Sequence, residues 1–169
     1  PDFEGIHSFK GEWCHTGRWP ADGMDLAGKR VGVIGTGASG VQLITEIAKE
    51  VGTLTVFQRT ANYCAPLRNG PIDDKTQQQI KANYPEIFKQ CSETAGSFIH
   101  KFDPRSAMEV SAEERMEQYE KLWAEPGFKK WLSNFYDVMI PGEANEDYAA
   151  FVRNKIRERV NDPAVAEML

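Results

Sequence analysis

Two short segments of the chain alternate β-branched or apolar residues with others, and most of the remaining apolar residues recur at helical spacing. Residues 30–34 and 53–57 have the composition of strands. Between them, apolar residues of the stretch from Ser39 to Val51 fall on one side of a predicted helix. A strand, a helix and a second strand in this order predict a βαβ unit whose strands lie parallel and are buried on both faces.

From Asp73 onwards the pattern predicts helices and no convincing strand. A first helix places Ile80, Tyr84 and Phe88 on one face, together with Ile87 and Cys91, and bends or ends near Pro85. We interpret these stripes as core positions rather than as a ligand site. Later helices are predicted from a capping box, three stripes and a second start signal: Ser111 with Glu114, Met116 to Trp123, Phe128 to Phe135, Tyr148 to Val160, and Asp162-Pro163.

Three glycines stand between the first strand and its helix, at Gly35, Gly37 and Gly40, and match the pattern GxGxxG. The first permits a tight turn, the second lets the backbone approach a pyrophosphate, and the third lets the helix lie against the strand. The start of the helix offers N–H groups and a positive dipole end to an anion. The pattern therefore predicts a dinucleotide site, and the weaker alternative is a structural turn without a ligand.

The end of the second strand indicates which dinucleotide binds. NAD-selective sites place an acidic residue there to hold the ribose 2′-hydroxyl, but this chain has none from Val51 to Ile72. It has Arg59 followed by Thr60, and a guanidinium can hold a 2′-phosphate through two hydrogen bonds. Both features favour NADP(H) over NAD(H). The alternative, that Arg59 is only a solvated loop residue, stays open at this point.

These elements predict an α/β fold: a partial Rossmann-type, doubly wound NADP-binding domain with an inserted helical subdomain. Residues 1–29 are expected to be a linker, residues 30–66 the N-terminal part of the NADP-binding domain, and residues 67–169 the helical insertion. Two strands that need cover on both faces cannot complete a doubly wound sheet alone. We therefore expect the chain to be an internal portion of a larger protein.

The composition narrows the class of protein. The 169 residues carry a net charge of −5 without a sustained basic stripe, which argues against nucleic acid as a main partner. The chain has neither an apolar run long enough to span a bilayer nor a signal-peptide pattern, so no membrane association is expected. Three cysteines without CxxC spacing indicate reduced thiols and a cytoplasmic setting. The histidines are not patterned as metal ligands, and no metal site is predicted.

A second motif lies upstream, in Phe9-Lys-Gly11-Glu-Trp-Cys-His15-Thr-Gly-Arg-Trp19-Pro20. By its own chemistry, His15 reads as a histidine that braces a connection, because no residue beside it completes a triad or a metal site. The spacing resembles the fingerprint F-x-G-x-x-x-H-x-x-x-W-P of type I Baeyer–Villiger monooxygenases. The sequence from Phe57 to Tyr63 and the helical remainder are similar to the cyclohexanone-monooxygenase-like branch, so that the resemblance covers essentially the whole chain.

The resemblance implies an enzyme in which NADPH reduces a bound FAD, and the reduced flavin uses O₂ to convert a ketone into an ester or lactone. The implied cofactor-binding residues are those of the glycine motif and of the second strand's end: Gly35, Thr36, Gly37, Ala38, Ser39, Gly40, Gln42, Arg59 and Thr60. No catalytic residue is implied in this segment, and His15 is expected to link domains. The family's FAD motif and catalytic arginine have no match here, so the chain alone is predicted to be inactive.

Two other functions remain open from the sequence. One is a stand-alone NADP-binding regulatory module without a flavin. The other is part of a flavin N-hydroxylating monooxygenase, a group that resembles this chain in the FxGxxxH pattern. Trp19 and Pro20 favour the Baeyer–Villiger interpretation, since the N-hydroxylating group usually lacks them. The sequence does not indicate which ketone is the substrate.

Overall fold

The computed structural model describes residues 3–169, which form two compact units. The first unit extends to Asn62 and the second runs from Tyr63 to Leu169. Each unit has its own hydrophobic core. The division falls somewhat earlier in the chain than the predicted boundary between residues 66 and 67.

The first unit contains the predicted βαβ unit. Strand β1 (Arg30–Ile34) pairs in parallel with β2 (Thr53–Phe57), and helix α1 (Ala38–Ile47) connects them. Two 3-10 helices, η1 (Ile6–Ser8) and η2 (Thr16–Arg18), precede the sheet. The core consists of Leu26, Val33 and Ile47, with Val31, Leu43, Ile44 and Leu54 packed against them. Both predicted strands are confirmed. Successive side chains of each strand point to opposite faces of the sheet, and one of these faces packs against α1.

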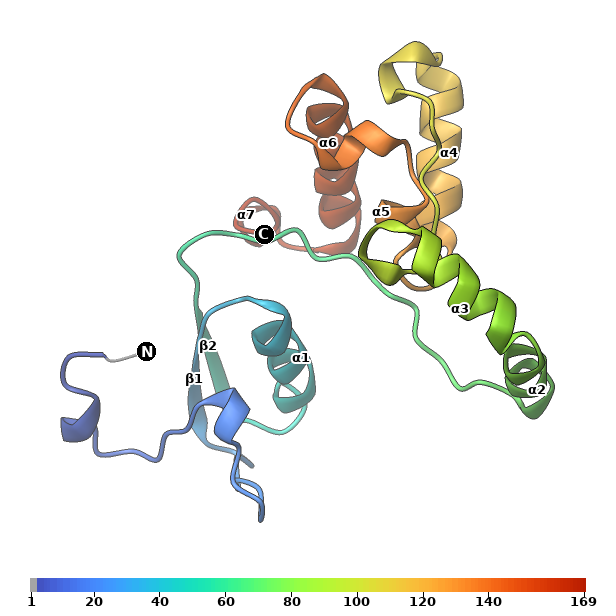
Figure 1. The fold of residues 1–169 in the computed structure, drawn as a ribbon. Helices are drawn as coiled ribbons and strands as arrows, with labels where there is room; N and C mark the ends of the chain where they lie inside the picture. The colour runs from blue at the N-terminus through green and yellow to red at the C-terminus, as the bar shows by residue number, and fades with distance from the viewer. Residues whose placement is uncertain (1–2) are drawn as a thin grey trace. The chain divides into compact units, whose positions relative to one another are not determined.

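The expectation that both strands are buried on both faces is wrong for this structure. Helix α1 covers one face of the sheet (Figure 1), whereas on the other face Ile34 is 68% exposed and Phe57 is 56% exposed. A two-layer unit with a single helix can shield only one face of a sheet. Within the described residues, the second face of the sheet is therefore left uncovered at Ile34 and Phe57.

The helix α1 ends at Ile47, before the predicted end at Val51. The chain must turn there because Gly52 packs directly on the backbone of Gly28. A Cβ atom at position 52 would lie 2.4 Å from the carbonyl oxygen of Gly28, and the Gly28 N–H donates a 2.9 Å hydrogen bond to the Glu50 carbonyl. Close backbone contact, rather than the apolar pattern, sets this end of the helix.

The second unit consists of helices, as predicted. Its longest helix, α6 (Glu143–Arg159), packs with α4 (Ala112–Ala124) around Tyr119, which is fully buried among other aromatic rings. The predicted break near Pro85 is confirmed at Asn83, between α2 and α3. The remaining helices are α2 (Asp74–Ala82), α3 (Tyr84–Glu93), η3 (Ala95–Ser97), η4 (Ala107–Glu109), α5 (Lys129–Leu132), η5 (Tyr136–Met139) and α7 (Pro163–Ala166).

Two details of the helical prediction are wrong. The first stripe is not core: Ile80, Tyr84 and Phe88 are exposed, and the last two stack on each other with ring centroids 5.4 Å apart. An apolar face is buried only where a second element packs across it. The capping box at Ser111 is half formed, because the Glu114 carboxylate pairs with Arg105 at 2.6 Å. A complete capping box occurs instead at η4, between Ser106 and Glu109.

Candidate functional site

The glycine motif and the Arg59 segment leave the sheet at the same edge. The parallel register pairs Ile34 with Phe57, so both strands end side by side. The Gly35 N–H then donates a 2.8 Å hydrogen bond to the Phe57 carbonyl. In a parallel α/β unit, ligands bind at this carboxyl edge of the strands. The fold therefore brings the two predicted halves of the site together.

The three glycines of the motif differ in whether the fold requires a glycine at their position. Gly35 has φ +98°, a conformation that side chains rarely adopt, and a Cβ at Gly40 would lie 2.4 Å from the Gly35 carbonyl oxygen. Gly37 has φ −68° and ψ 174°, and nothing in the described chain lies within 4 Å of a Cβ built there. The fold itself thus needs Gly35 and Gly40 but not Gly37. The space above Gly37 is open to a ligand.

Helix α1 begins at this open space. Gly37 is its N-cap residue, and no side chain caps the helix. Ala38 and Ser39, the first two residues of the helix, are exposed, while the Val41 N–H closes the first turn on the Gly37 carbonyl at 3.0 Å. An uncapped helix start of this kind can hold phosphate oxygens through its backbone N–H groups. Gln42 is exposed on the following turn.

The segment after β2 carries Arg59 and Thr60, both exposed and outside regular structure. A hydrogen bond ties its end to the glycine loop: the Asn62 Nδ2 donates to the Thr36 carbonyl oxygen at 3.3 Å. Asn62 was not among the residues singled out by the sequence, because 26 positions separate it from Thr36 and a lone amide carries no motif. The segment between Phe57 and Asn62 is thus fixed to the glycine loop at both ends.

His15 lies in the other motif and fixes a turn. It is the N-cap residue of η2, where its Nδ1 atom accepts a 3.0 Å hydrogen bond from the Gly17 N–H. An accepting Nδ1 places the proton of the neutral ring on Nε2. Within residues 3–169, no group of three or more potential metal ligands comes together, and no helix has the length and apolar content to cross a membrane.

Several known proteins align with this chain over its whole length. Identity is 46% over 175 residues to 2-oxo-Delta(3)-4,5,5-trimethylcyclopentenylacetyl-CoA monooxygenase of Pseudomonas putida, of which the chain covers 32%. It is 44% over 170 residues to cyclohexanone 1,2-monooxygenase of an Acinetobacter species and 38% over 170 residues to phenazine N-monooxygenase PhzNO1 of Lysobacter antibioticus, with 31% of each covered. The chain therefore spans about a third of the length of the curated relatives it matches.

A solved structure gives the same result at the level of the fold. The crystal structure of OTEMO in complex with FAD and NADP matches all of this chain with a TM-score of 0.94 and 46% identity, over 33% of that chain. No family model matches the sequence. The similarity in sequence and in structure confirms the predicted resemblance to Baeyer–Villiger monooxygenases.

Proposed function

We propose that this chain is the NADP(H)-binding and helical portion of an FAD- and NADPH-dependent Baeyer–Villiger monooxygenase. The observation that carries the proposal is Gly37, a glycine that the fold does not need, placed at the open start of α1. Relatives that align along the whole chain are monooxygenases three times as long, and one matching structure holds FAD and NADP. On this proposal, the βαβ unit is part of a Rossmann-type domain.

The residues present fit the coenzyme. The backbone from Thr36 to Ser39 and the side chain of Gln42 would hold the pyrophosphate, since the uncapped helix start supplies N–H groups and positive charge density. Arg59 and Thr60 would hold the 2′-phosphate, because a guanidinium and a hydroxyl both donate to phosphate oxygens. When bound, NADPH would supply a hydride to FAD, which would be held by parts of the enzyme outside this chain.

This chain contributes binding and orientation to the reaction rather than bond making. Its residues would hold the coenzyme by the 2′-phosphate and the pyrophosphate, and the open space at Gly37 would let the backbone come close to the pyrophosphate. The substrates of the complete enzyme would be a ketone and O₂, with an ester or lactone as product. We expect the isolated chain to bind NADP(H) without converting a ketone.

The test is the coenzyme preference of Arg59→Ala. A bond from a charged donor to phosphate stabilises binding by about 1.5–3 kcal/mol, which corresponds to roughly a 10- to 150-fold change in the dissociation constant. We expect the substitution to raise the dissociation constant of NADPH by a factor in this range and to leave the dissociation constant of NADH nearly unchanged. Isothermal titration calorimetry with both coenzymes measures the two constants directly.

Arg30→Ala is the matched control for this test. Arg30 is exposed at the start of β1, at the edge of the sheet opposite to the glycine loop. Its substitution removes the same charge and is expected to leave the ratio of the two constants unaltered. An Arg59→Ala protein that keeps the original preference for NADPH would exclude Arg59 from the site.

A second candidate is N-oxygenation, which the similarity to phenazine N-monooxygenase supports. On either proposal the glycine loop would hold NADPH, so the loop does not distinguish the two reactions. Supplying the complete enzyme with NADPH, O₂ and either cyclohexanone or phenazine separates the two. A lactone product supports the first proposal, and an N-oxide supports the second.

A further inference from the structure

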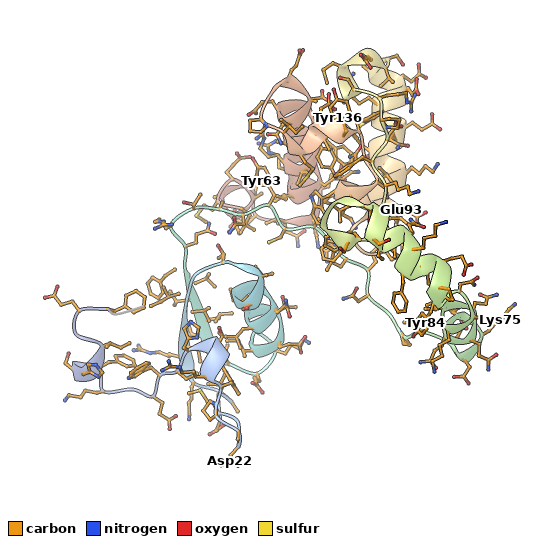
Figure 2. The ribbon with its side chains drawn as sticks, in the orientation of Figure 1. Asp22, Tyr63, Lys75, Tyr84, Glu93 and Tyr136 are labelled. Atoms are coloured by element: carbon orange, nitrogen blue, oxygen red, sulfur yellow. The ribbon has the colours of Figure 1, made fainter. Side chains whose placement is uncertain are left out.

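The segment that leads into helix α2 contains an asparagine followed directly by a glycine, Asn69-Gly70. Residues 61–73 have no regular structure, and both residues of the pair are exposed. Figure 2 labels Tyr63 and Lys75, which stand on either side of the pair, and Figure 1 shows the chain before α2 without a helix or strand. No other asparagine of the sequence is followed by a glycine.

The atoms of this pair that can react with each other are not held by hydrogen bonds. Among residues 3–169, neither the Asn69 side chain nor the Gly70 N–H has a hydrogen-bond partner. Gly70 does not have a left-handed φ, and a Cβ built on it meets nothing within 4 Å. The Asn69 side chain and the Gly70 nitrogen can therefore approach each other without breaking a hydrogen bond.

Other asparagines of the chain are held in place. The Asn134 side chain is fully buried, and its Oδ1 accepts a 2.9 Å hydrogen bond from the N–H of Phe135, the residue that follows it. Asn145 lies within α6 and donates from Nδ2 to the Val138 carbonyl oxygen at 2.7 Å. Both side chains would have to leave their partners before they could react with the backbone nitrogen of the next residue.

We propose that Asn69 is a site of spontaneous deamidation. The Gly70 nitrogen attacks Cγ of Asn69, so that an N–Cγ bond forms and the Cγ–Nδ2 bond breaks. The Gly70 proton leaves with Nδ2 as ammonia, and a succinimide ring remains. Water then opens the ring at either of its carbonyl carbons, which gives aspartate or isoaspartate at position 69. Gly70 favours the ring closure because it has no side chain beside the attacking nitrogen.

The product differs from asparagine in charge and, as isoaspartate, in backbone length. Just before the site, the chain is attached to the helical unit: the Leu67 carbonyl accepts a 2.9 Å hydrogen bond from the Gly127 N–H, and the Arg68 Nε donates to the Trp123 carbonyl at 3.4 Å. The new carboxylate and the additional backbone carbon lie between this attachment and α2. The modification therefore alters the connection that joins α2 to the rest of the helical unit.

The test incubates the 169-residue chain in neutral and in mildly alkaline buffer and follows it by peptide mapping with mass spectrometry. We expect the peptide that contains residue 69 to gain about 1 Da and to separate into an aspartate and an isoaspartate product. The rate should rise with pH, because the attacking nitrogen has to lose its proton.

Asn161 is the internal reference in the same experiment. It is exposed and lies outside a helix, as Asn69 does, but Asp162 follows it. The side chain of Asp162 hinders closure of the ring, so the peptide with Asn161 should keep its mass while the peptide with Asn69 is converted.

Two matched variants change different atoms of the site, so that one stays informative if the other folds poorly. Gly70→Ala fits the open space at this position and should reduce the rate to that of Asn161, because its methyl group hinders the attack. Asn69→Gln keeps the amide but moves it one carbon further from the backbone, and it should abolish the gain in mass at this position.

A synthetic peptide of residues 66–73 measures the same reaction without the fold. Because no hydrogen bond has to open first, the folded chain should react at a rate within about twofold of the peptide. A folded chain that keeps its mass at residue 69 while the peptide is converted would overturn the inference. Equal rates in the original chain and in Gly70→Ala would overturn it as well.

Discussion

The three glycines of the GxGxxG motif are present for different reasons, and the structure distinguishes these reasons. Gly35 is required by its positive φ and Gly40 by a backbone contact, whereas the surroundings of Gly37 would accept a side chain. From the sequence, all three carry the same letter in the same pattern. Only the geometry assigns Gly37 to a ligand rather than to the fold.

Gly37→Ala should therefore separate binding from stability. A methyl group in the space for the pyrophosphate costs about 1–3 kcal/mol of binding, or roughly 5- to 150-fold in the dissociation constant for NADPH. The free energy of unfolding should change by less than about 1 kcal/mol, since a weaker N-cap is offset by a less flexible unfolded chain. Calorimetry and urea unfolding measure the two quantities.

Gly40→Ala is the opposite case. Its Cβ would lie 2.4 Å from the Gly35 carbonyl oxygen, so the helix must move away from the turn. We expect a loss of stability of about 1–3 kcal/mol, together with weaker binding. Equal losses of stability in the Gly37 and Gly40 variants would contradict the assignment of Gly37 to the ligand.

Capping residues decide where the helical elements begin, and two serines allow a direct comparison. Ser106 accepts the Met108 N–H at 3.1 Å and also donates a 2.6 Å hydrogen bond to the Asp137 carboxylate, which ties η4 to η5. Ser111 accepts only the Glu114 N–H, at 3.2 Å. The first serine therefore holds two elements, and the second holds one.

Ser106→Ala should destabilise the helical unit more than Ser111→Ala. Loss of an N-cap costs about 1 kcal/mol, and a lost hydrogen bond to a charged partner adds about 1.5–3 kcal/mol. We expect a loss of about 2.5–4 kcal/mol for Ser106 and about 1 kcal/mol for Ser111. Urea unfolding followed by circular dichroism gives both values, and equal losses would show that the Asp137 bond contributes nothing.

Local signals made several elements predictable from the sequence. Both strands, the break before Pro85 and the Asp162 cap depend on neighbouring residues, and the structure has them where they were expected. The hydrogen bond from Asn62 to Thr36 joins residues that lie far apart along the chain. The stripe at Tyr84 is exposed because no other element of the described chain packs across it. A one-dimensional pattern contains no information about such contacts, which is why these features were missed.

For the molecule as a whole, two buried tyrosines in the aromatic core of the helical unit make the free energy of unfolding decrease at alkaline pH. Burial raises the pKa of Tyr119 and of Tyr148 well above the ordinary value of 10.0, and neighbouring Asp147 adds to the effect at Tyr119. The folded state then keeps protons that the unfolded state has lost, so stability is complete below pH 10 and falls as the pH rises further. Each tyrosine contributes up to about 1.4 kcal/mol per pH unit.

Above pH 10, the free energy of unfolding should decrease less steeply with pH in Tyr148→Phe, by the slope that corresponds to about one proton. The Tyr148 hydroxyl donates to the Lys130 carbonyl at 2.7 Å, so the variant also loses some stability at neutral pH. Burial lowers the pKa of Lys130, which acts in the opposite direction and raises stability toward pH 10.5. Urea unfolding at several pH values between about 8 and 12 measures the slope, and identical slopes in both proteins would contradict the prediction.

The uncovered side of the sheet has a practical consequence for producing this chain by itself. With the order β1-β2, each strand has one outer edge without a partner strand among the described residues, next to the exposed Ile34 and Phe57. Copies of the chain can join edge to edge or stack at that side, so we expect light scattering to grow with concentration. Thr55→Lys places a charge on the uncovered face of the sheet and should abolish the increase of light scattering with concentration. Gln78→Lys on α2 adds the same charge away from the sheet and should leave this increase unchanged.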